Sequence, residues 1–366
     1  MSNLSANFKK IIVTGGAGFI GGAVIRNLLI NSSAKIFNLD KFGYASDVSG
    51  IKETLSKLPS RDRKKYFQIK VNLSNFIEVK ELINQIKPDL IMHLAAETHV
   101  DRSIENPKEF LESNIVGTFN LLEASRNFLN NTSIQRRDIF KFIHVSTDEV
   151  FGSLGENGFF SEKSNYDPRS PYSSTKAASD HLVSAWFHTY NFPAIITNCS
   201  NNYGPWQFPE KLIPIVINKI LNKESIPMYG DGKNIRDWLY VEDHADAIIL
   251  VANKGLAGDK FCIGGNSEKS NKEVIISICE FMDKNLKRDF PSSELISSVH
   301  DRPGHDFRYA MDTRLINEKL GWKPCHNFSK GLEKTILWYL SNKEWTKTVL
   351  KKSNYNSERI GLIEEK

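Results

Sequence analysis

A glycine-rich turn between a predicted strand and a predicted helix constrains the fold of this chain more than any other feature. The apolar, β-branched run 10–14 (KIIVT) is typical of a buried strand, and the segment 15–21 (GGAGFIG) follows it directly. Glycines allow the tight turn, and their missing side chains let backbone N–H groups and a helix N-terminus approach a phosphate. The pattern therefore predicts the first unit of a dinucleotide-binding sheet.

An acidic residue supports this interpretation. Residues 35–39 are predicted as the second strand, and Asp40 stands at its end, about 20 residues beyond the glycine turn. A carboxylate there can accept hydrogen bonds from both ribose hydroxyls and would repel a 2′-phosphate, so the sequence favours NAD over NADP. The competing interpretation is a purely structural glycine turn followed by an unrelated surface aspartate.

Short apolar runs alternate with helical segments through the first half of the chain. Strands are predicted at 67–71, 89–94, 140–146 and 194–198, and long helices at 106–129 and 172–190. Strands separated by helices imply crossover connections and a parallel sheet that is covered on both faces. The predicted fold class is α/β, a doubly wound parallel Rossmann-type sheet with a smaller α+β C-terminal substrate lobe.

Prolines and shorter elements mark a change of organisation after about residue 200. Ser270 and Glu273 form a capping-box signature before an apolar run, and 330–340 has the spacing of an amphipathic helix. We predict an NAD-binding Rossmann domain over 1–200, with a return segment near 236–256, and a substrate-binding lobe over 201–345. Residues 346–366 are predicted as a polar, peripheral tail.

Composition excludes several other classes of protein. The 366 residues carry 48 Lys+Arg and 43 Asp+Glu, a net charge of +5 spread along the chain, which gives no support to nucleic-acid binding. The four cysteines lie far apart without a CxxC pair, so neither a metal site nor a disulfide framework is indicated, and a reducing, cytoplasmic compartment fits best. The first residues lack the apolar core of a signal peptide and no run is long enough to span a bilayer, so we expect no membrane association.

Two side chains on one predicted helix suggest chemistry. Tyr172 and Lys176 stand at positions i and i+4, so they lie on the same helix face. We expect the Lys176 ammonium to lower the pKa of Tyr172 toward neutrality, giving a base that takes a hydroxyl proton while hydride leaves the carbon. An exposed helix pair would be the simpler interpretation, but Ser146 and Thr147 end an earlier strand, where a doubly wound sheet places its site.

These residues and four longer motifs carry a family resemblance. The motifs are 93–103 (HLAAETHVDRS), 146–152 (STDEVFG), 198–205 (NCSNNYGP) and 301–306 (DRPGHD). In this order they resemble the dTDP-glucose 4,6-dehydratases, a family of the extended short-chain dehydrogenases/reductases, and the resemblance runs from about Lys10 to Leu340. It implies an NAD-dependent lyase (hydro-lyase) that supplies a 4-keto-6-deoxy sugar nucleotide for deoxysugar biosynthesis, such as that of rhamnose.

The resemblance assigns catalytic roles to five residues. Thr147 and Tyr172 would hold the C4 hydroxyl, and Tyr172 would accept its proton beside Lys176. Glu149 would remove the C5 proton, while a protonated Asp148 would donate to the departing C6 hydroxyl. Hydride then returns to C6, so NAD stays bound as a catalytic cofactor. Two adjacent carboxyls with opposite protonation demands need environments that split their pKa values.

The resemblance also carries over the ligand contacts, residue by residue. The expected cofactor-binding residues are Gly15, Gly18, Phe19, Ile20, Gly21, Asp40, Lys41, Asn72, Leu73, Leu94, Ala95, Ala96, Ser113, Tyr172, Lys176 and Asn202. The expected substrate-binding residues are Thr98, Thr147, Asn201, Asn202, Lys211, Leu212, Pro227, Tyr229, Arg236, Asn271, Asp301, Arg302 and His305. Arg236 suits a diphosphate because its fork binds oxyanions bidentately, although a surface arginine paired with Asp237 is the competing interpretation.

Other functions fit many of the same residues. The substrate is expected to be dTDP-glucose, but thymine and uracil cannot be distinguished from spacing, so a UDP-glucose 4,6-dehydratase or a sugar-nucleotide 4-epimerase is the enzyme alternative. A non-catalytic NAD-binding protein is the alternative from a different class. The family also implies a homodimer formed through a four-helix bundle of the helices near 106–129 and 172–190, although long apolar-faced helices are equally expected from packing on the sheet.

Overall fold

Seven parallel strands form the central sheet of the protein. The computed structural model describes residues 4–5, 7–286, 290–301, 304–353 and 355. The strand order is β10-β6-β5-β4-β1-β2-β3, and every neighbouring pair is parallel. The strands are β1 (Lys10–Thr14), β2 (Lys35–Asp40), β3 (Tyr66–Lys70), β4 (Leu90–His93), β5 (Lys141–Thr147), β6 (Ala194–Cys199) and β10 (Lys260–Ile263). The predicted parallel sheet is confirmed, and the strands predicted up to residue 198 agree with the observed ones within one residue at each end.

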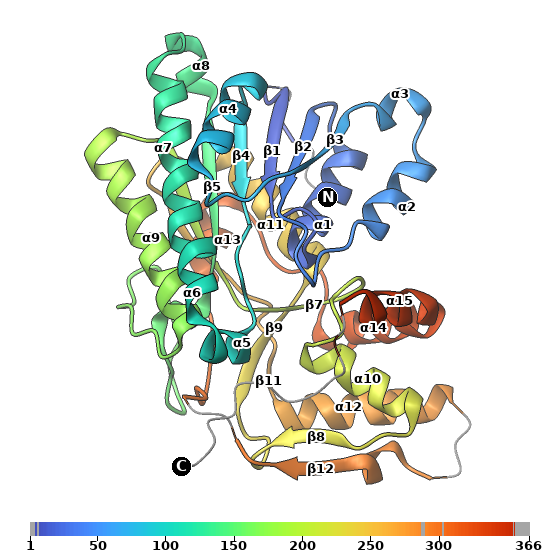
Figure 1. The fold of residues 1–366 in the computed structure, drawn as a ribbon. Helices are drawn as coiled ribbons and strands as arrows, with labels where there is room; N and C mark the ends of the chain where they lie inside the picture. Colours follow the sequence, from blue (N-terminus) through green and yellow to red (C-terminus); the bar gives the residue numbers. More distant parts are fainter. Residues whose placement is uncertain (1–3, 6, 287–289, 302–303, 354, 356–366) are drawn as a thin grey trace.

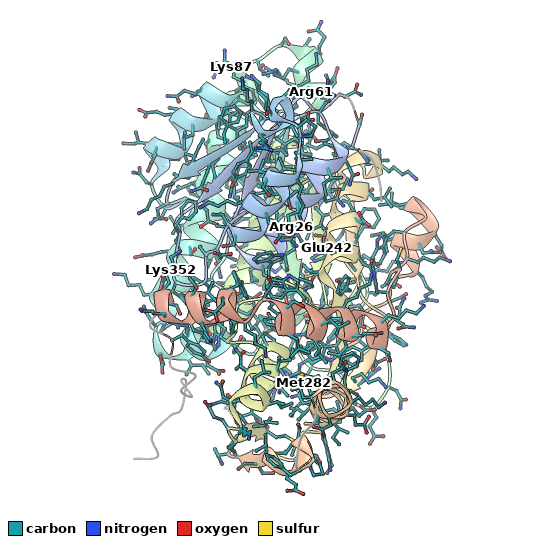
Figure 2. All side chains as sticks on the ribbon, turned by 90° about the vertical axis from the view of Figure 1, so that its right-hand side faces the viewer. Arg26, Arg61, Lys87, Glu242, Met282 and Lys352 are labelled. Carbon is teal, nitrogen blue, oxygen red and sulfur yellow. The ribbon has the colours of Figure 1, made fainter. Side chains whose placement is uncertain are left out.

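Helices cover both faces of this sheet, as Figure 1 shows. One face is packed by α4 (Phe76–Ile86), α7 (Gly117–Asn130) and α9 (Pro171–Tyr190), and the other by α1 (Phe19–Asn31), α11 (Val241–Lys254) and α13 (Arg314–Leu320). Arg26 on α1 and Glu242 on α11 form an ion pair at 2.7 Å within the second layer (Figure 2). The shorter helices of this half are α2 (Ser49–Lys57), α3 (Ser60–Arg63), α5 (Val100–Glu105) and α8 (Ile134–Ile139). Among the described residues, no helix is both long and apolar enough to cross a bilayer.

The glycine turn packs tightly against the end of the sheet. Gly15 has a φ of +68°, and a Cβ atom there would lie 2.7 Å from the backbone of Ala95. A Cβ atom on Gly21 would lie 2.2 Å from the carbonyl oxygen of Gly15. Because no side chain tolerates contacts this short, glycine is required at both positions, and the predicted strand–turn–helix unit is confirmed.

The helix predicted over 106–129 is one helical run with a wide turn in it. α6 (Pro107–Phe110) leads into a π-helical segment, η1 (Leu111–Val116), which continues as α7. In the wide turn, Asn114 accepts a hydrogen bond from the Glu97 N–H at 2.8 Å and donates to the Thr175 hydroxyl at 2.9 Å. Turns of this kind are frequent at functional sites, and this one ties the helix to the segment after β4 and to α9.

A smaller α+β lobe follows the first six strands of the sheet. It contains a three-stranded sheet, β11-β9-β7, and a two-stranded parallel sheet, β12-β8. Its elements are β7 (Asn201–Tyr203), α10 (Leu212–Asn222), β8 (Ile226–Tyr229), β9 (Ile235–Tyr240), β11 (Glu268–Ser270), α12 (Asn271–Asn285), η3 (Ser292–Leu295), β12 (Ile296–Val299) and α14 (Phe328–Ser341). The predicted capping box is confirmed at the start of α12, where the Glu273 N–H donates to Ser270 Oγ at 3.2 Å and the Ser270 N–H donates to the Glu273 carboxylate at 2.7 Å.

Part of the second half of the chain returns to the central sheet. α11 packs against α1, and β10 pairs with β6 at the edge of the sheet. Parts of the chain beyond residue 256 therefore also contact the central sheet, because β10 completes it next to β6 and α13 packs against β10. The division into a domain over 1–200 and a lobe over 201–345 stays a prediction.

The segment beyond α14 packs against both halves of the protein. It forms the helix α15 (Lys343–Ser353), in which the Trp345 ring contacts those of Trp206 and Trp338, with centroids 5.4 and 5.0 Å apart. The Trp345 Nε1–H also donates to the Asp47 carboxylate at 3.0 Å. The tail predicted over 346–366 is helical as far as residue 353, and Thr346 and Val349 within it are buried, so this part of the polar segment packs on the protein. Residues 354 and 356–366 of that predicted tail lie outside the described residues.

Candidate active site

A cavity of about 510 Å³ lies at the carboxyl ends of the parallel strands, between the sheet and the second lobe. This is where a doubly wound sheet binds its ligands. All of the predicted catalytic residues and all of the predicted cofactor-binding residues line it. The fold therefore brings together side chains that stand far apart in the sequence.

The predicted substrate-binding residues differ in where they lie. Those that line the same cavity are Thr98, Thr147, Asn201, Asn202, Lys211, Leu212, Pro227, Tyr229, Arg236, Asn271 and His305. Asp301 does not line the cavity. Its carboxylate forms a hydrogen bond with Nδ1 of His305 at 2.6 Å, and His305 does line the cavity. Arg302 lies outside the described residues.

The two predicted catalytic carboxyls lie on a 3₁₀ turn at the end of β5. The turn, η2 (Asp148–Phe151), begins directly after Thr147, whose hydroxyl donates to Asp148 Oδ1 at 3.1 Å and accepts from the Glu149 N–H at 3.3 Å. Asp148 is 2% exposed, and its Oδ2 has no hydrogen-bond partner among the described residues. Burial first, and the neighbouring Glu149 second, raise the pKa of Asp148 well above its usual range. The site therefore favours the protonated form of Asp148.

Tyr172 and Lys176 lie on α9 as predicted, but their electrostatics differ from the prediction. The Lys176 ammonium donates to the carbonyl of Val145 at 2.9 Å. Burial first, and the charge of Glu149 second, raise the pKa of Tyr172 well above its usual range, opposed in part by a hydrogen bond with Thr147. The predicted lowering of this pKa toward neutrality is therefore wrong for the chain by itself, because burial of the phenol and the charge of Glu149 raise it.

A buried anion lies one helical turn beyond Lys176. Asp180 accepts hydrogen bonds from the Tyr166 hydroxyl at 2.7 Å and the Asn198 amide at 3.0 Å, and its carboxylate lies 3.1 Å from His144 Nε2. Burial alone would raise the pKa of Asp180, but these contacts and the Lys176 charge lower it overall. Burial lowers the pKa of Lys176, and Asp180 opposes that shift. Asp180 therefore supports the charged form of Lys176.

The glycine turn and Asp40 fit NAD. No side chain caps α1 at Gly18, and no acidic residue stands in its first turn, so its terminal N–H groups suit a pyrophosphate. A Cβ atom on Gly18 would contact only the Gly15 carbonyl, at 3.2 Å, which leaves the side toward the cavity open. Asp40 is buried, and its carboxylate accepts from the Ala17 N–H at 3.0 Å, so it is fixed where an adenosine ribose can bind. These residues would hold the pyrophosphate and the ribose.

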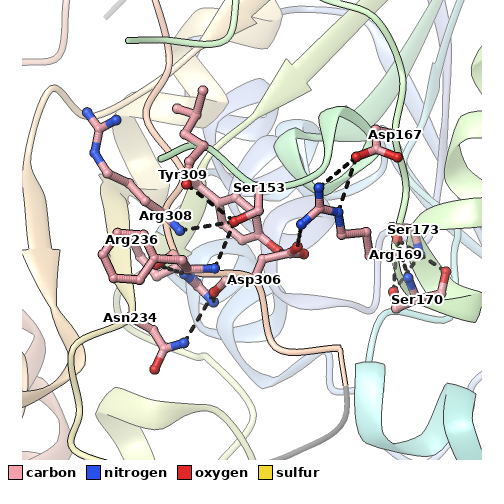
Figure 3. Close-up of polar contacts among 12 residues, drawn as sticks. Ser153, Asp167, Arg169, Ser170, Ser173, Asn234, Arg236, Asp306, Arg308 and Tyr309 are labelled. Atoms are coloured by element: carbon pink, nitrogen blue, oxygen red, sulfur yellow. Dashed lines mark hydrogen bonds and ion pairs between the residues drawn. The ribbon is translucent and has the colours of Figure 1, made fainter. Parts of the chain in front are cut away.

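Arg236 lies on the wall of the cavity with its guanidinium anchored, as Figure 3 shows. The guanidinium donates to backbone carbonyls, that of Asp306 among them at 2.9 Å, and its central carbon lies 4.2 Å from the centre of the Tyr309 ring. The competing interpretation, a surface arginine paired with Asp237, is wrong, because Arg236 is buried and Asp237 accepts from two backbone N–H groups instead. Binding of a diphosphate by Arg236 stays a prediction.

Sequence reasoning missed a contact at the cofactor end of the cavity. The Tyr44 hydroxyl donates to Glu210 Oε1 at 2.9 Å, and both residues line the cavity. The Arg102 guanidinium lies 3.7 Å from the centre of the Tyr44 ring. Tyr44 and Glu210 are 166 residues apart and share no motif, so no local signal could have revealed the pair.

The glycine turn, Asp40 and the Tyr172–Lys176 pair on one Rossmann sheet define an NAD-dependent enzyme of the extended short-chain dehydrogenase/reductase class. The sequence model of the GDP-mannose 4,6 dehydratase family matches residues 12–335. A dTDP-glucose 4,6-dehydratase of Neisseria meningitidis serogroup B is 48% identical over 359 residues, which cover 96% of this chain and 99% of the relative. The chain belongs to this family of 4,6-dehydratases, and within it to the dTDP-glucose 4,6-dehydratases.

Solved structures agree with this assignment. A dTDP-glucose 4,6-dehydratase of Bacillus anthracis in complex with NAD is 38% identical with a TM-score of 0.81, and the match covers 93% of this chain and 99% of that one. The dTDP-glucose 4,6-dehydratase of Streptomyces venezuelae with NAD bound is 34% identical with a TM-score of 0.83 and the same coverage. Both structures contain the cofactor that the glycine turn and Asp40 predict here.

Proposed function

We propose that this protein is a dTDP-D-glucose 4,6-dehydratase, which converts dTDP-D-glucose to dTDP-4-keto-6-deoxy-D-glucose and water. The observation that carries the proposal is the buried Asp148 next to Glu149, at the end of β5 and in the same cavity as Tyr172. Moving a hydride out and back needs one proton acceptor, whereas expelling water also needs a second base and a neutral acid. The names of the similar relatives support dTDP-glucose as the sugar nucleotide.

The first half of the reaction oxidises C4. Thr147 and Tyr172 hold the C4 hydroxyl, and Tyr172 takes its proton as the hydride leaves. Because burial raises the pKa of Tyr172, this base needs positive charge nearby, and Lys176, supported by Asp180, supplies part of it. When bound, NAD supplies the nicotinamide ring that accepts the hydride and later returns it, and its positive charge also favours the phenolate.

The second half of the reaction removes water and completes the product. The 4-ketone acidifies the C5 hydrogen, which Glu149 removes as a proton. Asp148 gives its proton to the C6 hydroxyl, which leaves as water, and the raised pKa keeps that proton available. Glu149 then returns a proton to C5 as C6 receives the hydride. Transfer of a proton from Tyr172 to Asp148 through solvent resets the site.

Turnover in deuterated water tests the proposal. The purified protein is incubated with dTDP-glucose, and the product is analysed by mass spectrometry and NMR. We expect a new methyl group at C6 and deuterium at C5. Recovery of a glucose or galactose nucleotide would contradict a dehydratase and favour an epimerase or a non-catalytic protein. A parallel assay with UDP-glucose should give a much lower kcat/KM.

We further infer that the product supplies deoxyhexose synthesis, such as that of rhamnose, in a reducing, cytoplasmic compartment. The family resemblance supports the pathway. The compartment is supported by the cysteines, since Cys199, Cys262, Cys279 and Cys325 are all free thiols in the structure. Loss of rhamnose-containing polymers in a deletion strain, together with cell fractionation, tests both inferences.

We also propose that the protein is a homodimer formed through η1, α7 and α9. α7 and α9 pack on the sheet with one side, while Leu111, Val116, Phe119 and Tyr190 in this region are 41–49% exposed. Large apolar side chains gathered on one face are typical of an interface. Light scattering after gel filtration should give twice the 41.6 kDa chain mass, and Phe119→Lys should shift the protein toward the monomer.

A further inference from the structure

The loop after Asp40 covers the cofactor end of the cavity. Residues 41–48 connect β2 to α2, and Tyr44 and Ser46 are among those that line the cavity. On the Rossmann side the Asp47 N–H donates to the Ala17 carbonyl in the glycine turn at 2.8 Å, and the Ser46 hydroxyl donates to the Asp40 carboxylate at 3.1 Å. The loop is therefore tied to both predicted NAD contacts, the glycine turn and the ribose acid.

The second lobe contacts this loop at Tyr44. The Tyr44 hydroxyl donates to Glu210 at 2.9 Å, and its ring packs edge-on against Phe208 with centroids 5.7 Å apart. Glu210 is 7% exposed, so this hydrogen bond is sheltered from competing water. His99 and Arg102 lie 3.7 and 3.8 Å from the other Glu210 oxygen and help to hold the carboxylate in place.

α15 contacts the loop from another direction. The Trp345 indole N–H donates to the Asp47 carboxylate at 3.0 Å. Lys352, which Figure 2 shows toward the end of α15, donates to a backbone carbonyl of the loop at 3.4 Å. Trp206 packs under the start of α2, where a Cβ atom on Gly50 would lie 2.9 Å from the indole ring. Segments from the second half of the chain therefore hold the loop at Tyr44 and, through α15, at Ser46 and Asp47.

We propose that Tyr44, Glu210, Asp47 and Trp345 are positioning residues that hold the loop 41–48 over bound NAD and prevent its release during turnover. The inference rests on the proposed function, in which the hydride removed from C4 must return to C6 of the same sugar. An enzyme that lost the reduced cofactor between these steps would release an unfinished intermediate. The contacts of Tyr44 with Glu210 and of Asp47 with Trp345 come from the second half of the chain, which carries most of the proposed sugar-nucleotide contacts, so the fold links cofactor retention to that half.

Release of radiolabelled NAD tests this proposal without any sugar nucleotide. Holoenzyme loaded with labelled NAD is diluted into excess unlabelled NAD, and the label that stays on the protein is followed by rapid gel filtration. Tyr44→Phe and Trp345→Phe each remove one hydrogen bond to a carboxylate, and we expect release to become about tenfold faster in each variant. Trp186→Phe is the matched control, because the Trp186 indole N–H donates to Glu123 at 3.1 Å, away from the loop.

A second readout separates cofactor retention from general damage. With excess NAD in the assay, the activity of each variant should stay constant with time, whereas without added NAD it should fall as the cofactor is lost. Parental release rates in both variants would overturn the proposal, and so would faster release that Trp186→Phe matches. A change in Tyr44→Phe alone would overturn the part assigned to α15. Because the measurement follows NAD alone, it stays decisive even if the dehydratase assignment fails.

Discussion

The buried amide of Asn198 donates to the Asp180 carboxylate at 3.0 Å and, with the same nitrogen, to the Thr147 carbonyl at 3.1 Å. Asp180 follows Lys176 by one turn of α9, and Thr147 is the last residue of β5, directly before the two proposed catalytic carboxyls. The groups proposed to move the C4 proton and those proposed to remove water therefore share one buried support.

Replacing Asp180 with asparagine should lower the free energy of unfolding by about 2 kcal/mol, because the groups bonded to it lose an anionic acceptor. The folded state lowers the pKa of Asp180 below its ordinary 3.8, so its stabilising effect is present above that pH and is lost as the pH falls through the folded pKa. Urea unfolding at about pH 7 and at about pH 3 measures both effects. A difference between parent and variant that stays the same at both pH values would contradict this account.

Tyr172→Phe should reduce turnover by about 10²–10⁴-fold, because the variant has no group to take the C4 proton. The ring packing stays, so the variant should still fold and retain NAD. Single-turnover absorbance of reduced nicotinamide measures the oxidation step directly, and the NAD content of the purified protein is the control. Normal formation of reduced nicotinamide in this variant would exclude Tyr172 as the base.

Asp148→Asn should spare oxidation at C4 and slow water loss, by about 10²–10⁴-fold. In the parent the elimination step needs the protonated form of Asp148, whose pKa is raised by burial. Its rate should therefore fall as the pH rises through that pKa, and the asparagine variant should lack this fall. Rapid-quench mass spectrometry separates the two steps. Equal loss of oxidation and of elimination would contradict the role of Asp148 as the acid.

Glu149→Gln is the companion variant. It removes the base but keeps the size of the side chain, so formation of the 6-deoxy product should slow by about 10²–10⁴-fold while the oxidised C4 intermediate still forms. Formation of the C5-deuterated product at the parental rate would assign the C5 proton to another group.

Two glycines of the phosphate turn should respond differently to alanine. Gly21→Ala places a Cβ atom 2.2 Å from the Gly15 carbonyl, so the turn must open and the protein should lose several kcal/mol of stability or fail to fold. Gly18→Ala meets only that carbonyl at 3.2 Å, so it should fold and bind NAD more weakly. Thermal unfolding and NAD titration measure the two effects, and equal unfolding temperatures for both variants would contradict the distinction.

Local sequence patterns were sufficient for most of the elements that the structure describes. Examples are the strand over 10–14, the helix that begins near Tyr172 and the capping box at Ser270. Each depends only on neighbours within one turn or one strand, so the local sequence is enough to predict it. Motifs placed every predicted catalytic and cofactor-binding residue in one cavity. The packing of α15 was not predicted, because Trp345 contacts Asp47 and Trp206, which lie far away in the sequence.

The sequence by itself determined that this chain forms a parallel dinucleotide-binding sheet and carries a dehydratase's set of side chains. Only the tertiary structure decided their electrostatic state, since burial raises the pKa values of both Tyr172 and Asp148. It also decided that Tyr44 bonds to Glu210, 166 residues away, over the cofactor end of the cavity. The reason is physical: residue type and spacing fix local geometry, whereas desolvation and long-range contacts exist only in the packed chain.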